Sequence, residues 1–284
     1  MKFAAVNVSI IGLGRVGSSL AARMLAEESR DISLNLMDTD PMIEGAQMEF
    51  QHAAALGGHA LTANGRQELS QADLVFFCAG KVSRRGASRL SVRKMNVDLA
   101  LEIFRGIRFK KQPMIVAISN PVDIVTHHIR KLGVTDEYET HGEPVKAWVL
   151  GEHGNSMVPV YSQSLVSGNP LPAGKRYRHK LERCTHLLRT SATRIRMTQP
   201  ATRWGVSECA FRIYKAFAGD VDFHFPLSVK PDLHFAKICR AKEISIGLPV
   251  KLDPDGIKVN GNFQLTLDES ELLSASARVI QRNL

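Results

Sequence analysis

Near its N-terminus the chain reads Val6-Asn7-Val8-Ser9-Ile10-Ile11-Gly12-Leu13-Gly14-Arg15-Val16-Gly17. The first six residues are rich in β-branched side chains, which predicts a short buried strand. Glycines follow at the spacing G-x-G-x-x-G, and the segment Ser18 to Glu28 places Leu20, Met24 and Leu25 on one face of a helix. A strand that turns through glycines into a helix indicates the start of a βαβ unit.

A second predicted strand, Ile32 to Met37, completes this unit and ends at Asp38. Gly12 permits the tight turn, Gly14 lets the backbone approach a pyrophosphate, and Gly17 lets helix pack on strand. The helix N-terminus favours the negative charge of that pyrophosphate. Asp38 would bond both ribose hydroxyls and repel a 2′-phosphate, so the sequence predicts NAD rather than NADP.

The same pattern continues through the first half of the chain. Buried strands are expected at Leu74 to Gly80 and Met114 to Ser119, and helices at Glu44 to Ala55 and Leu90 to Ile107. Alternating strands and helices predict an α/β fold with a doubly wound parallel sheet, the Rossmann arrangement. Ligands of such sheets bind at the carboxyl ends of the strands, so the loops there are the expected binding edge.

A histidine lies between glycines in Gly151-Glu152-His153-Gly154, directly after the apolar run Val145 to Leu150. An imidazole at the end of a buried strand, with glycine leaving room for a ligand, can serve as a general acid or base. The local sequence alone favours the other interpretation, a loop histidine bonded to a backbone carbonyl. The catalytic interpretation therefore depends on the rest of the chain.

Composition limits the class of protein. The 284 residues are 44% hydrophobic and 23% charged, which is ordinary for a soluble globular protein with one large domain or two lobes. Neither a membrane span nor a signal peptide is expected. No metal site is expected, since His127 and His128 lack companions at ligand spacing. Scattered cysteines without a C-x-x-C pair predict reduced thiols in the cytoplasm: Cys78, Cys184, Cys209 and Cys239.

The formal charge of +9 is unevenly placed. The segment Gly174 to Arg196 carries eight basic residues against the single acid Glu182, a local charge of +7. Such a segment attracts anions: a nucleotide, a carboxylate substrate or nucleic acid. A solvated helix face is favoured over a nucleic-acid site, because no zinc-finger spacing, RNA-recognition signature or aromatic interleaving accompanies the charge.

Several motifs together resemble the lactate/malate dehydrogenase family, in the family's order and over nearly the whole chain. They are the loop Cys78 to Leu90, Ser119-Asn120-Pro121-Val122-Asp123, Gly151-Glu152-His153-Gly154, Pro200 to Gly205, and Ile246 to Val250. The resemblance implies a Rossmann domain at residues 1–122 and a C-terminal α+β substrate domain at residues 123–284. It also implies an NAD-dependent oxidoreductase of small 2-hydroxy and 2-oxo acids, assembled as a homodimer or homotetramer. The family's final helix is expected at Leu267 to Asn283, and Asp268-x-x-Glu271 predicts its capping box.

The resemblance also assigns residue roles. His153 would exchange the proton with the substrate, and Arg89 would close over the site and polarise the carbonyl. Asn120, Thr202 and Ser83 would contact the substrate, although Arg89 as a surface arginine and Thr202 as a helix cap stay open. The expected cofactor-binding residues are Gly12, Gly14, Arg15, Val16, Gly17, Asp38, Ala79, Gly80, Asn96, Ser119 and Asn120.

The chain departs from the family between Asp123 and His153. There the family carries L-D-x-x-R, whose Asp orients the histidine and whose Arg grips the substrate carboxylate. The interval Ile124 to Trp148 contains no such motif and is too short to hold it. Nothing in the spacing selects a replacement among Asp136, Glu137, Glu139 and Glu152 for the carboxylate, or among Arg84, Arg130 and Arg203 for the guanidinium.

Three hypotheses follow from these motifs and their gap. The first is an active dehydrogenase with a weakened site. Its substrate stays open because Ser83 stands where the family usually has Gln or Arg to choose between lactate and malate. The second is a catalytically degenerate relative that binds NAD and serves as a binding or assembly module. The third, nucleic-acid binding through the basic segment, has little support.

Overall fold

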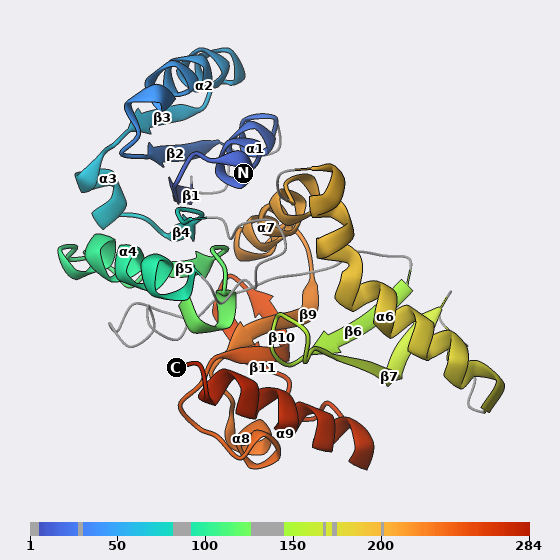
Figure 1. The fold of residues 1–284 in the computed structure, drawn as a ribbon. Helices are drawn as coiled ribbons and strands as arrows, with labels where there is room; N and C mark the ends of the chain where they lie inside the picture. The colour runs from blue at the N-terminus through green and yellow to red at the C-terminus, as the bar shows by residue number, and fades with distance from the viewer. Residues whose placement is uncertain are drawn as a thin grey trace.

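The computed structural model describes residues 6–27, 31–81, 92–125, 145–166, 169–171, 175–199 and 202–284. The first half forms a five-stranded sheet in which every pair of neighbouring strands is parallel, in the order β3-β2-β1-β4-β5 (Figure 1). These strands are β1 (Val6–Ile11), β2 (Ile32–Met37), β3 (Ala60–Ala63), β4 (Leu74–Phe77) and β5 (Met114–Ala117). The strand order reverses at β1, so the predicted doubly wound sheet is confirmed.

Helical segments connect consecutive strands of this sheet. They are α1 (Arg15–Leu25), η1 (Pro41–Ile43), α2 (Glu44–Gly57), α3 (Arg66–Ser70) and α4 (Arg93–Arg105). Helix α1 begins three residues before the expected Ser18, because Gly14 already occupies its N-cap position and the turn is correspondingly short. Strands β4 and β5 end earlier than expected, at Phe77 and Ala117, where the chain leaves the sheet for the loops at its edge.

Both faces of the parallel sheet are buried, as its continuous apolar strands require. On one face Val75 and Phe77 pack with α4, and the rings of Phe77 and Phe104 lie 5.7 Å apart. On the other face the side chains of Phe76 and Val116 are fully buried in a second, larger cluster. Each such side chain contributes about 1.5–3 kcal/mol to folding, so both layers are strongly held.

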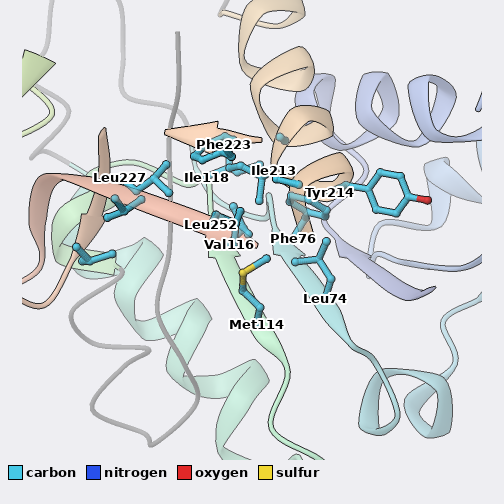
Figure 2. Close-up of a cluster of buried hydrophobic side chains, with 14 of the residues drawn as sticks. Leu74, Phe76, Met114, Val116, Ile118, Ile213, Tyr214, Phe223, Leu227 and Leu252 are labelled. Atoms are coloured by element: carbon cyan, nitrogen blue, oxygen red, sulfur yellow. The ribbon is translucent and has the colours of Figure 1, made fainter. Parts of the chain in front are cut away.

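The larger cluster continues from the sheet into the second half of the chain. Figure 2 shows Phe76 and Val116 beside Ile213 and Tyr214 of α7 (Trp204–Phe217). Helix α7 also lies against α1, where the guanidinium of Arg23 stacks 3.9 Å from the ring centre of Phe211. The two halves therefore share one continuous core.

The second half is an α+β arrangement, as expected. Its two antiparallel sheets have the orders β6-β7-β8 and β11-β10-β9. Their strands are β6 (Val145–Leu150), β7 (Val158–Val166), β8 (Asn169–Pro170), β9 (Phe223–Val229), β10 (Ile246–Asp253) and β11 (Gly256–Val259). The remaining helices are α6 (Lys175–Thr198), α8 (Leu233–Cys239) and α9 (Leu267–Gln281).

The expected capping box of α9, Asp268 with Glu271, is wrong. Thr266 is the N-cap: its hydroxyl accepts the N–H of Glu269 at 3.2 Å, and the Glu269 carboxylate accepts the N–H of Thr266 at 2.9 Å. An N-cap residue needs extended backbone, which Thr266 has, whereas Asp268 already lies in the first helical turn. The Glu269 carboxylate also accepts the hydroxyl of Ser162 at 2.6 Å and thereby ties α9 to β7.

The parallel sheet contains β5, and the next described strand, β6, belongs to an antiparallel sheet. Residues 126–144 lie outside the described residues, so the division into 1–122 and 123–284 stays a prediction. Within the described parts of the chain, none of the helices has the length and apolar character needed to cross a lipid bilayer.

Candidate active site

The glycine loop between β1 and α1 is shaped by close contacts. Gly12 has φ +95°, and a Cβ there would lie 2.4 Å from the backbone nitrogen of Ala79. A Cβ at Gly17 would lie 1.9 Å from the carbonyl oxygen of Gly12. Gly14, in contrast, is exposed and has open space around it. Two glycines are thus required by the fold, and the third leaves the backbone open to a ligand.

Asp38 lies directly beside this loop, at the end of β2. Its Oδ2 accepts the N–H of Leu13 at 2.7 Å, and its Oδ1 accepts the N–H of Asp40 at 3.0 Å. Arg15 and Val16 stand in the first turn of α1, with Arg15 exposed. An open glycine, a helix N-terminus and a fixed carboxylate therefore meet at one edge, and this arrangement fits a dinucleotide.

Asn96 connects the ends of the next two strands. Its side chain is 1% exposed, its Nδ2 donates to the carbonyls of Lys81 at 3.1 Å and Asn120 at 2.7 Å, and its Oδ1 accepts the N–H of Lys81 at 2.6 Å. The Ser119 hydroxyl donates to the carbonyl of Ala79. A Cβ at Gly80 would lie 3.1 Å from Asn96 and from Ser119. Asn96 thus shapes this edge of the sheet by holding the backbone of Lys81 and Asn120.

The loop that carries His153 starts from a pair of facing glycines. Gly151, with φ +90°, exchanges two backbone hydrogen bonds with Gly247 of β10, at 2.9 and 3.1 Å. The hydroxyl of Ser276 on α9 accepts the next N–H, that of Glu152, at 2.7 Å. The Glu152 carboxylate in turn accepts the hydroxyl of Ser156 at 2.7 Å. The loop is therefore held from β10 and from α9.

Asp123 ties this loop to the segment that follows β5. The backbone N–H of His153 donates to Asp123 Oδ2 at 2.7 Å, and the hydroxyl of Ser228 on β9 donates to Oδ1 at 2.7 Å. Asp123 is 3% exposed, and burial raises the pKa of its carboxyl to about 6. The bonds from His153 and Ser228 and the charge of the imidazole oppose that rise, and the Glu152 charge adds to it. Asp123 thus fixes the backbone of His153 to the segment that follows Asn120.

Two members of this cluster had no predicted role. Asp123 was only part of a family motif, although an acid among the apolar residues Val122, Ile124 and Val125 is itself a signal of a buried carboxylate. Ser228 carried no signal, since a serine in a strand is ordinary and its partner lies far away in the sequence.

Several predicted residues lie outside the described residues. They are Ser83, Arg84, Arg89, Arg130, Asp136, Glu137 and Glu139. Helix α7 begins at Trp204 and its N-cap is Arg203, one residue after Thr202, so the interpretation of Thr202 as a helix cap is wrong. The Nε of Arg203 donates to Ser19 of α1 at 2.6 Å, and its guanidinium stacks on Trp204 with 4.2 Å to the ring centre.

The basic segment is part of α6, and Arg183, Arg189 and Arg194 are exposed on it. Arg189 also donates to the carbonyl of Met157 at 3.1 Å. Exposure of these three arginines agrees with the expected solvated helix face. All four cysteines are free thiols, as expected. Among the residues with described positions, no group of three or more His, Cys, Asp or Glu is placed to hold a metal ion.

Comparison with known families agrees with this geometry. Residues 6–142 match the model of the NAD binding domain of lactate/malate dehydrogenase, and residues 127–284 match the alpha/beta C-terminal domain of the same family. The chain belongs to the lactate/malate dehydrogenase family. It is an oxidoreductase of that family, and the expectation of NAD as its cofactor is confirmed.

The similar proteins include L-lactate dehydrogenases and a malate dehydrogenase. The L-lactate dehydrogenase of Kosmotoga olearia is 28% identical over 311 aligned positions, which cover 97% of this chain and 94% of the relative. Because 311 exceeds the 284 residues of the chain, the relative carries segments without a counterpart here.

Two solved structures show the same fold. The malate dehydrogenase of Cryptosporidium parvum has a TM-score of 0.85 at 18% identity, and covers 99% of this chain and 98% of its own. The lactate dehydrogenase of the same organism, complexed with lactic acid and NAD, has a TM-score of 0.85 at 19% identity, with 99% and 97% covered. Because the two TM-scores are equal, the likeness in fold does not distinguish lactate from malate as the substrate.

Proposed function

We propose that the protein is an NAD-dependent dehydrogenase that interconverts a small 2-hydroxy acid and the corresponding 2-oxo acid, lactate-like or malate-like. One observation carries this proposal. The bond from His153 to Asp123 anchors a histidine at the edge of the sheet where the glycine loop and Asp38 also lie. This anchoring supports His153 as the proton-transfer group of the proposed dinucleotide-dependent reaction.

The chemistry balances with the residues proposed. When bound, the reduced cofactor supplies a hydride, a hydrogen with two electrons, to the carbonyl carbon of the substrate. As the carbonyl π bond breaks, His153 delivers a proton to the oxygen, and in the reverse direction it removes that proton from the hydroxyl. Arg89 is proposed to polarise the carbonyl, and Asn120, Thr202 and Ser83 to contact the substrate.

The cofactor contacts follow the strand ends. Gly12, Gly14, Arg15, Val16 and Gly17 are proposed to hold the pyrophosphate at the N-terminus of α1. Asp38 is proposed to take the ribose hydroxyls, because its carboxylate is already fixed by the N–H of Leu13. The remaining contacts are proposed at the ends of β4 and β5, through Ala79, Gly80, Ser119, Asn120 and, indirectly, Asn96.

A second candidate is a relative that binds NAD without turnover and serves as a binding or assembly module. The interval Ile124 to Trp148 favours it, because this interval contains no L-D-x-x-R. In the serine-protease triad, loss of the carboxylate that orients the histidine lowers the rate by a factor on the order of 10⁴, which sets the scale for such a loss. If the first candidate is right, its site works without the family's L-D-x-x-R residues and is weakened or rebuilt.

NADH oxidation with pyruvate, oxaloacetate and longer 2-oxo acids tests the proposal. We expect turnover of at least one acid, and a loss of about 100-fold or more in kcat for His153→Asn. His224→Asn, a matched change at an exposed histidine of β9, should leave kcat unchanged.

Two outcomes would contradict this assignment. Unchanged turnover in His153→Asn would remove His153 from the mechanism. Quenching of protein fluorescence by NADH, without turnover of any acid, would favour the binding module.

A further inference from the structure

We propose that Asp123 is the positioning residue of His153, the carboxylate that fixes its loop and sets the electrostatic environment of its imidazole. This inference rests on the proposed function of His153. Asp123 would take the place of the Asp in the family's L-D-x-x-R segment, which this chain does not contain. None of the carboxylates considered from the sequence is needed for it.

The backbone geometry fixes two points of the same short loop. Ser228 of β9 is paired in register with Gly247 of β10, and Gly247 bridges to Gly151. Asp123 accepts from Ser228 with one oxygen and from the N–H of His153 with the other, both at 2.7 Å. The residue between Gly151 and His153 is itself held by α9. The Cα–Cβ direction of His153 is consequently defined by this cluster.

The charge of Asp123 matters in addition to its hydrogen bonds. An asparagine oxygen would accept the N–H of His153 equally well, and its burial would cost less than that of an ionised carboxylate. The described groups that act on Asp123 are the N–H and the charge of His153, the hydroxyl of Ser228 and, with like charge, the carboxylate of Glu152. A negative Asp123 therefore favours the protonated imidazole, the form that donates a proton to a 2-oxo acid.

The titration of His153 in the protein without added substrate tests the coupling directly. The C2–H proton resonance of His153 is assigned by its loss in His153→Asn and followed with pH by NMR. In Asp123→Asn we expect the titration midpoint of His153 to move to lower pH, because the opposing charge is gone. An unchanged midpoint in a folded Asp123→Asn protein would overturn the proposal.

Steady-state kinetics separates positioning from simple structural support. In Asp123→Asn we expect kcat to fall about tenfold or more, with an NADH dissociation constant within about twofold of the parent value. The Ser228 bond lowers the pKa of Asp123, so Ser228→Ala should raise that pKa. The acid limb of its pH–rate profile should then move to higher pH.

Asp255→Asn, in the exposed turn between β10 and β11, is the matched control and should change neither the titration nor kcat. Full kcat with an unchanged acid limb in both Asp123→Asn and Ser228→Ala would refute the positioning role. If no 2-oxo acid is turned over by the parent protein, the proposed function fails, and the NMR titration still decides the coupling. Ser228→Ala, which retains the carboxylate, covers the case in which Asp123→Asn does not fold.

Discussion

At the scale of single residues, Asp123 is kept charged at a cost to stability. Burial raises the pKa of its carboxyl from 3.8 to about 6, and a shift of this size corresponds to about 3 kcal/mol against the ionised form. The folded protein therefore binds this proton more tightly than the unfolded chain does. Its favourable contribution is present below pH 3.8 and is lost as pH rises through about 6.

This linkage predicts how Asp123→Asn changes stability with pH. The free energy of unfolding of the variant, minus that of the parent, should rise by roughly 1 kcal/mol between pH 5 and pH 8, because asparagine does not ionise. Urea unfolding at the two pH values measures the difference. A difference that stays constant or falls with pH would mean that burial does not dominate the environment of Asp123.

At the scale of elements, the sequence pattern predicted those strand bounds that depend on residues close together in the chain. β1 and β2 have the predicted bounds, because a short apolar run between turn residues fixes a buried strand. The cap of α9 was misplaced by two residues, since the choice between neighbouring candidate caps depends on which one has extended backbone.

The cluster around His153 lay beyond such patterns. Asp123 is 30 residues from His153 and 105 from Ser228, and only the assembled sheets bring the three together. Local glycine and strand signals single out His153 as a candidate, whereas its catalytic role follows from the family resemblance and stays a prediction. Its carboxylate partner is a tertiary feature, and spacing along the chain does not encode it.

The bridge at the start of the His153 loop gives a prediction of its own. In Gly151→Ala a Cβ would lie 2.6 Å from the hydroxyl of Ser276 on a backbone with φ +90°, and we expect a loss of about 1–3 kcal/mol in unfolding free energy. Gly205→Ala, in the first turn of α7 with open space around it, should be neutral or stabilising. Chemical denaturation of both variants decides this, and equal effects would refute the argument from strain.

At the scale of the whole molecule, helix α2 is one of several helices that expose large apolar side chains. Helix α2 lies at the outer end of the parallel sheet (Figure 1) and buries Gln47 and Ala54, whereas Met48 and Leu56 are 52% and 92% exposed. Scattered exposed apolar side chains are common on single chains. Because the family resemblance predicts a homo-oligomer, we expect a second copy of the chain to pack on this surface of α2.

Light scattering after size exclusion tests this arrangement. The parent protein should have at least twice the chain mass of 31.4 kDa, and Leu56→Arg should shift it toward the monomer, because a buried unpaired guanidinium opposes association. Leu233→Arg is the matched control: Leu233 is 81% exposed on α8, which lies far from α2 in Figure 1. A parent protein of monomer mass would remove the homo-oligomer, and equal masses for both variants would place the contact elsewhere than α2.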